Sequence, residues 1–234
     1  VFSPPYSELD HPIRKMTLEN ICAVSTVFFP FIFLMKNKTL KDYMVMAGIV
    51  SGILAFVYPS NAVSQTFDGM FSGDKHAFSF EVIRFYIAHW IILAVPYAML
   101  RFKIHTLSAK RALRPPMILI SVLFLIYINE LVLTQLGWVP KEDLYNPEGR
   151  NPSLIFGIPG SFDKAGWILL ILVPAFLLVH PVTGEAFSWP VFWMVIPLFI
   201  YATVLSFIFV SITDREGTKA LFSRWLRGTH PVSH

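Results

Sequence analysis

The sequence has little cysteine and little charge. Cys22 is the single cysteine among 234 residues, which excludes an internal disulfide and a metal site built from several cysteines. Only 15% of the residues are charged, whereas soluble domains contain about 25%. The first stretch, VFSPPYSELDHP, lacks the basic and apolar regions of a signal peptide, so we expect residues upstream of Val1. Composition therefore indicates a class other than soluble domains.

Apolar and aromatic residues are abundant instead. The chain is 55% hydrophobic, contains 22 phenylalanines and has a mean hydropathy of +0.58, as membrane proteins do. Its net charge of +4 is spread over short loops beside apolar runs, where Lys and Arg anchor helices at lipid headgroups. We therefore expect membrane lipids as partners and no nucleic acid. The loop histidines lack metal-ligand spacing, so we predict no metal and no cofactor.

Long apolar runs divide the chain into spans. A run of about 17 to 25 apolar residues can cross a bilayer as a helix. The candidate runs are Leu18–Met35, Tyr43–Tyr58, Phe80–Phe102, Pro116–Trp138, Trp167–Val179 (only marginally long enough) and Trp189–Ile212. We predict an all-α multi-pass transmembrane bundle of about six spanning helices over residues 18–212. A polar, interfacial segment (1–17) precedes it, and a basic amphipathic tail (213–234) follows it and lies at the interface.

Two features within these runs concern helix packing. Gly48 and Gly52 are spaced for close approach of a neighbouring helix to the second run. Pro96 lies well inside the third run, where it should kink the helix rather than end it. Both features predict tight contact between spans.

A thiol and an imidazole occur inside different spans. Cys22 and Ser25 follow helical spacing on the first run, so both lie on one face, which we expect to point inward. His89 lies in the third run, with Phe85 and Tyr86 about one turn before it. An ionisable group at membrane depth is costly where it faces lipid, so His89 should face the interior and is a candidate for function.

Polar residues also lie near the middle of the fourth run, where Asn129 and Glu130 are adjacent. Together with Cys22 and His89 they suit acyl transfer. The thiol would attack a lipid ester while the imidazole takes its proton, and a hydroxyl of a second lipid would then accept the acyl chain. Asn129 would donate a hydrogen bond to the oxyanion. We expect the surrounding lipid-binding region to include Ser25, Phe85, Tyr86 and Glu130.

Structural interpretations of the same residues stay open. A lone cysteine in an apolar helix usually packs as a small hydrophobe with an inert thiol. An intramembrane histidine or asparagine often only joins helices by a hydrogen bond, which applies to His89 and Asn129. Glu130 pairs with Arg84 or handles protons, and the sequence does not rank the two.

The order of several short motifs resembles the transmembrane protein 164 acyltransferases and their bacterial YwaF-like relatives. The similar pieces are Asn20-Ile21-Cys22; Phe80-Glu81, Phe85-Tyr86-Ile87, His89 and Val95-Pro96-Tyr97; Asn129; and Asn146-Pro147-Glu148-Gly149 with Gly157, Pro159 and Trp167. The resemblance implies a Cys22–His89 catalytic pair that transfers a fatty acyl chain between glycerophospholipids. Departures occur at Ala23, Ala88 and Phe162-Asp163, and they bear on the choice of substrate.

Three functional hypotheses follow. The first is a multi-pass acyltransferase that moves a fatty acyl chain between phospholipids through Cys22 and His89. The second is a non-catalytic subunit that keeps this fold and scaffolds a larger membrane complex with other membrane protein subunits. The third, a proton-coupled transporter using His89, Glu130 and Arg84, is disfavoured because the sequence has no repeated halves.

Overall fold

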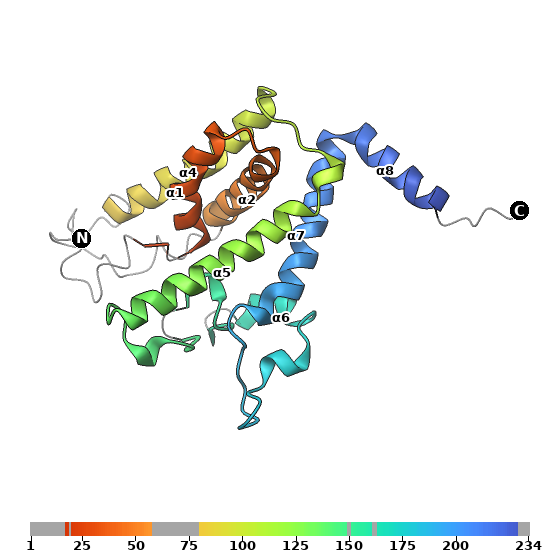
Figure 1. The fold of residues 1–234 in the computed structure, drawn as a ribbon. Coiled ribbons are helices and arrows are strands. Elements are labelled where there is room, and N and C mark those ends of the chain that lie inside the picture. The colour runs from red at the N-terminus through yellow and green to blue at the C-terminus, as the bar shows by residue number, and fades with distance from the viewer. Residues whose placement is uncertain (1–16, 19, 58–79, 149–150, 161–162, 229–234) are drawn as a thin grey trace, which may run out of the picture.

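The computed structural model describes residues 17–18, 20–57, 80–148, 151–160 and 163–228. Within these ranges the fold is helical, and the only β pairing is an isolated bridge between Val179 and Ala186. The α-helices are α1 (Ile21–Leu34), α2 (Lys38–Val57), α4 (Phe80–Arg101), α5 (Arg114–Gln135), α6 (Asp163–Leu170), α7 (Phe192–Thr213) and α8 (Arg215–Gly228) (Figure 1). Except for Thr17, the predicted N-terminal segment lies outside the described residues.

Among the described helices, four are long and apolar enough to cross a membrane: α2, α4, α5 and α7. They correspond to four of the predicted runs and confirm the all-α, multi-pass fold. The first run forms α1, which is apolar but has only 14 residues. Helix α2 begins at Lys38, several residues before the predicted start at Tyr43, because the polar stretch between them is helical.

The run Trp167–Val179 differs from its prediction. It does not form one helix: α6 ends at Leu170, the chain turns, and a short 3-10 helix, η9 (Ala175–Leu178), follows Pro174. Proline lacks the N–H that an α-helix needs, and it disfavours helical geometry at the residue before it, here Val173. This segment packs against α7.

Helix α2 lies at the centre of the bundle. It contacts α1, α4 and α5, whereas α7 leaves a broad apolar surface exposed, including Ile200, Val204 and Ile208. A helix that is hydrophobic all round and largely unburied within its own chain suits a lipid surrounding. Lipid chains therefore cover this side of the bundle.

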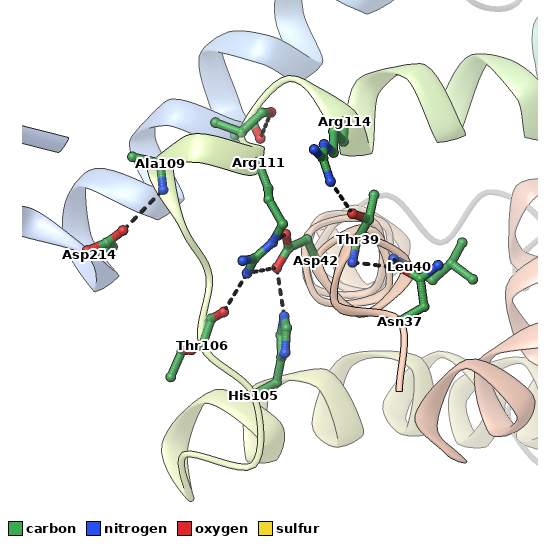
Figure 2. A network of polar contacts seen from close by, with 12 residues as sticks. Asn37, Thr39, Leu40, Asp42, His105, Thr106, Ala109, Arg111, Arg114 and Asp214 are labelled. Carbon is green, nitrogen blue, oxygen red and sulfur yellow. Dashed lines mark hydrogen bonds and ion pairs between the residues drawn. The ribbon is translucent and has the colours of Figure 1, made fainter. Parts of the chain in front are cut away.

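A buried carboxylate ties the connection between α4 and α5 to the first turns of α2 (Figure 2). Asp42 is almost fully buried. His105 Nε2 donates to its Oδ1 at 2.7 Å, and the Arg111 guanidinium donates to both of its oxygens. Arg111 also donates to the Thr106 carbonyl at 2.9 Å. A buried charge is stable only when it is paired and hydrogen-bonded, and these two partners meet that condition.

Arg111→Ala should lower the free energy of unfolding by about 3 kcal/mol, because it leaves Asp42 buried beside a single remaining partner. The matched control is Lys110→Ala, which removes the neighbouring exposed charge and should change the free energy by less than about 0.5 kcal/mol. Unfolding of both variants in detergent, followed by circular dichroism against denaturant, measures the difference. Equal stabilities would contradict the structural role of Arg111.

Candidate functional site

Cys22 lies in the first turn of α1. The Asn20 side chain caps the helix by accepting from the Ala23 N–H at 2.8 Å, and the Ile21 N–H donates to Ser153 Oγ at 3.1 Å. Among the described residues, the Cys22 N–H has no hydrogen-bond partner. The start of a helix carries free N–H groups and a partial positive charge, which favours negative charge nearby. The local structure therefore offers a hydrogen-bond donor to an oxyanion.

Two buried hydroxyl groups lie beside this cysteine. Ser25 is 1% exposed and Tyr43, on α2, is 3% exposed. Neither hydroxyl has a hydrogen-bond partner of normal geometry within the described chain. The Tyr43 hydroxyl is close enough to Ser25 and Cys22 to interact with both electrostatically. Since a buried hydroxyl without a partner costs free energy, this pair is available to bind a polar group of a ligand.

Sequence reasoning placed Ser25 here but missed Tyr43. A tyrosine at the start of an apolar run is typical of an interfacial anchor, and no sequence signal distinguished this one. The tertiary fold turns its side chain towards α1, where its ring contacts Phe29 edge-on with centroids 6.3 Å apart.

His89 is buried on α4, with 8% of its surface exposed. Its Nδ1 lies 2.7 Å from the Phe85 carbonyl oxygen, one turn earlier. A carbonyl can only accept, so Nδ1 carries the proton and Nε2 of the neutral ring keeps its lone pair. The Phe85 ring packs against the imidazole at 4.1 Å between centroids. The ring is thus fixed with one nitrogen available as a base.

The remaining predicted site residues are more dispersed. Tyr86 stacks on Phe56 and is partly exposed at the bundle surface. Asn129 donates to Thr17 Oγ1 at 3.5 Å, which ties α5 to the chain just before α1. Glu130 is buried and takes part in a polar interaction. Asn129 and Ser153 therefore hold the start of α1 at one end of the bundle.

No hydrogen bond or electrostatic interaction joins Cys22 to His89 in the part of the chain that the structure describes. The same residues contain no group of three His, Cys, Asp or Glu side chains arranged to hold a metal ion. The fold brings Cys22 together with Ser25 and Tyr43. His89 lies on α4, a different neighbour of α2.

Two glycines of α2 allow that approach, as their spacing predicts. A Cβ atom at Gly48 would lie 2.7 Å from both the Ile92 carbonyl oxygen and Pro96 Cγ, and 3.0 Å from the Phe29 ring. A Cβ atom at Gly52 would lie 2.7 Å from Leu93 Cβ and 3.4 Å from the His89 carbonyl oxygen. Only glycine permits these contacts, so α1 and α4 both pack closely on α2.

Long apolar helices around a sparsely polar interior define an integral, multi-pass membrane protein. The TMEM164 family profile matches residues 13–155, which is more than half of the chain, and the protein belongs to the TMEM164 family. No curated protein and no solved structure matches the chain. The matched range includes Cys22, Tyr43, His89 and Asn129.

Gly48→Leu should destabilise the fold by about 3 kcal/mol, because the new side chain overlaps the α4 backbone and the Phe29 ring. Leu54→Ala, on the exposed side of the same helix, is the control and should cost less than about 1 kcal/mol. Thermal unfolding in detergent compares the two variants. A Gly48→Leu protein as stable as the control would mean that this close approach is absent in solution.

Proposed function

We propose that the protein transfers an acyl chain between membrane phospholipids, with Cys22 as nucleophile and His89 as general base. The observation that carries the proposal is the meeting of α1 and α4 at a single position of α2. Phe29 from α1 and Pro96 from α4 both contact Gly48. Each of them is two helical turns beyond one of the proposed catalytic residues.

The contacts of α2 show how α1 and α4 pack on it. Gly48 faces Ile92 and Pro96, while Gly52 faces His89 and Leu93, so α4 runs antiparallel to α2. Helix α1 precedes α2, and a short turn connects the two. Helices α1 and α4 both contact α2 and also contact each other, with α1 crossing α4 at an angle (Figure 1).

Cys22 precedes Phe29 on α1 by the same number of residues as His89 precedes Pro96 on α4. Positions two turns apart lie on the same face of a helix, displaced by about 10 Å along its axis. Both residues thus belong to helix faces that converge on α2, where Tyr43 lies near Cys22 and Gly52 packs against the turn of His89. Among the described residues no hydrogen bond joins the two side chains, and catalytic contacts often tighten only when substrate binds.

The chemistry proceeds in two balanced steps. His89 Nε2 takes the proton of the Cys22 thiol as the sulfur attacks the carbonyl carbon of a phospholipid ester. The ester C–O bond then breaks, the leaving lysophospholipid oxygen receives the proton from His89, and a thioester remains on Cys22. In the second step His89 deprotonates the hydroxyl of an acceptor lysophospholipid, which attacks the thioester and releases the thiol.

Hydrogen-bond donors for the oxyanion are available beside the sulfur. Among the described residues the Cys22 N–H has no partner, and the Tyr43 hydroxyl has none of normal geometry. No well-formed hydrogen bond therefore has to break when substrate arrives. Preorganised donors of this kind lower the free energy of a tetrahedral intermediate. The Asn129 side-chain amide has a second N–H besides the one that it donates to Thr17, and this N–H is a further donor for the oxyanion. Ser25, Phe85, Tyr86 and Glu130 remain candidates for lining the lipid site.

Cys22→Ser and His89→Gln should each reduce acyl transfer by at least about 100-fold, because each removes a group that acts in every turnover. The assay reconstitutes the full chain in vesicles with a phospholipid carrying a labelled acyl chain and an unlabelled lysophospholipid. Hydroxylamine should release label from the wild type and not from Cys22→Ser. His180→Gln, in an exposed loop, is the control and should keep full activity. Transfer that persists without the thiol would refute the mechanism, and the absence of transfer by the wild type would favour the non-catalytic subunit.

Tyr43→Phe should lower the rate by roughly 100-fold, the loss expected for one oxyanion donor, without lowering stability. The hydroxyl it removes makes no hydrogen bond of normal geometry within the described chain. The matched control is Tyr201→Phe: Tyr201 donates to the Ile168 carbonyl at 2.6 Å. That variant should lose about 1 kcal/mol of stability and keep its rate. Parallel measurements of rate and unfolding separate the two, and a destabilised but fully active Tyr43→Phe would refute the assignment.

A further inference from the structure

Helix α8 extends away from the other helices (Figure 1). It follows α7 directly and contacts the end of α7 and the 3-10 helix η5 (Ala109–Arg111). Its large apolar side chains are exposed: Phe222 by 62% and Trp225 by 64%, with Leu221 and Leu226 also open. Exposed apolar side chains gathered on one helix indicate a contact surface rather than a bundle element.

The residues of α8 separate into two faces. Leu221, Phe222, Trp225 and Leu226 follow three- and four-residue spacing and share one side. The Phe222 and Trp225 rings contact each other at 6.2 Å between centroids. Lys219 and Arg224 lie along the flanks of this strip, and Arg215 precedes it on the same side. Lys219 also pairs with Glu216 at 3.3 Å. An apolar strip bordered by basic residues is typical of helices that lie in the plane of a membrane surface.

The position of α8 relative to the membrane follows from the spans beside it. Helix α7 crosses the bilayer and ends at Thr213, one residue before Asp214. The Asp214 carboxylate accepts from the Ala109 N–H at 3.1 Å and from the Gly217 N–H at 3.1 Å. Ala109 belongs to the connection between two other spans, α4 and α5 (Figure 2). The start of α8 is therefore held at the membrane boundary by independent elements.

We propose that α8 binds the anionic surface of the membrane that the bundle crosses. Leu221, Phe222, Trp225 and Leu226 enter the boundary between headgroups and acyl chains, and Arg215, Lys219 and Arg224 contact lipid phosphates. Charge favours this partner over a second copy of the chain, since pairing two such helices would bring their basic flanks together. The bilayer supplies both the apolar layer and the negative charge at the level where α8 begins.

The lone cysteine makes a direct test practical. In a Cys22→Ser background of the full chain, Leu226→Cys probes the apolar face and Ser223→Cys the polar face. Each is labelled with an environment-sensitive fluorophore and reconstituted in phosphatidylcholine vesicles with or without phosphatidylglycerol. Lipids with a quencher on the acyl chain should quench the probe at position 226 several-fold more than the probe at 223, and phosphatidylglycerol should increase the difference.

A second variant isolates the role of charge. Adding Arg215→Gln, Lys219→Gln and Arg224→Gln to the position-226 probe should abolish the effect of phosphatidylglycerol, as should high salt in the unmodified helix. Equal quenching at both positions would overturn the proposal. So would a position-226 probe that lipid does not quench while Leu226→Cys crosslinks two copies of the chain, because α8 would then be a protein interface.

Discussion

The buried Asp42 carboxylate is the constraint on which the arrangement of the helices depends. A negative charge in a low-dielectric interior is tolerated only with partners of good geometry. Its partners, His105 and Arg111, both come from the connection between α4 and α5. Satisfying one charge therefore anchors the end of α4 and the start of α5 to the same turn of α2. The three helices cannot separate without exposing Asp42 or leaving it unpaired.

With α2 fixed in this way, small residues decide how close its neighbours come. Gly48 admits α1 and α4 together, and Gly52 admits the turn that carries His89. The polar groups of the candidate site are spread over α1, α2 and α4, so their separation depends on these contacts rather than on any local motif. Tyr43 follows Asp42 directly in sequence, which links the orientation of its hydroxyl to the same anchored turn. Stability and site geometry thus share one framework.

The sequence predicts those features that depend on local composition. Apolar runs locate α2, α4, α5 and α7, and glycine spacing locates the close contacts of α2. It does not reveal the Asp42 pairing, because His105 and Arg111 lie more than 60 residues away and nothing in a polar loop identifies its partner. It also misses that the stretch before Tyr43 is helical and that Pro174 interrupts an apolar run. The catalytic pairing of Cys22 with His89 stays a prediction.

The shortness of α1 has a consequence for the bilayer itself. A helix of 14 residues rises about 21 Å, whereas the hydrocarbon layer is about 30 Å thick. The last turn of α1 adjoins the lysines that begin α2, at one surface of the membrane. The first turn of α1 therefore lies inside the opposite leaflet. There, unpaired backbone groups require protein partners, which Asn20 and Ser153 provide. Lipids beside a helix this short must shorten or tilt their chains to match its length.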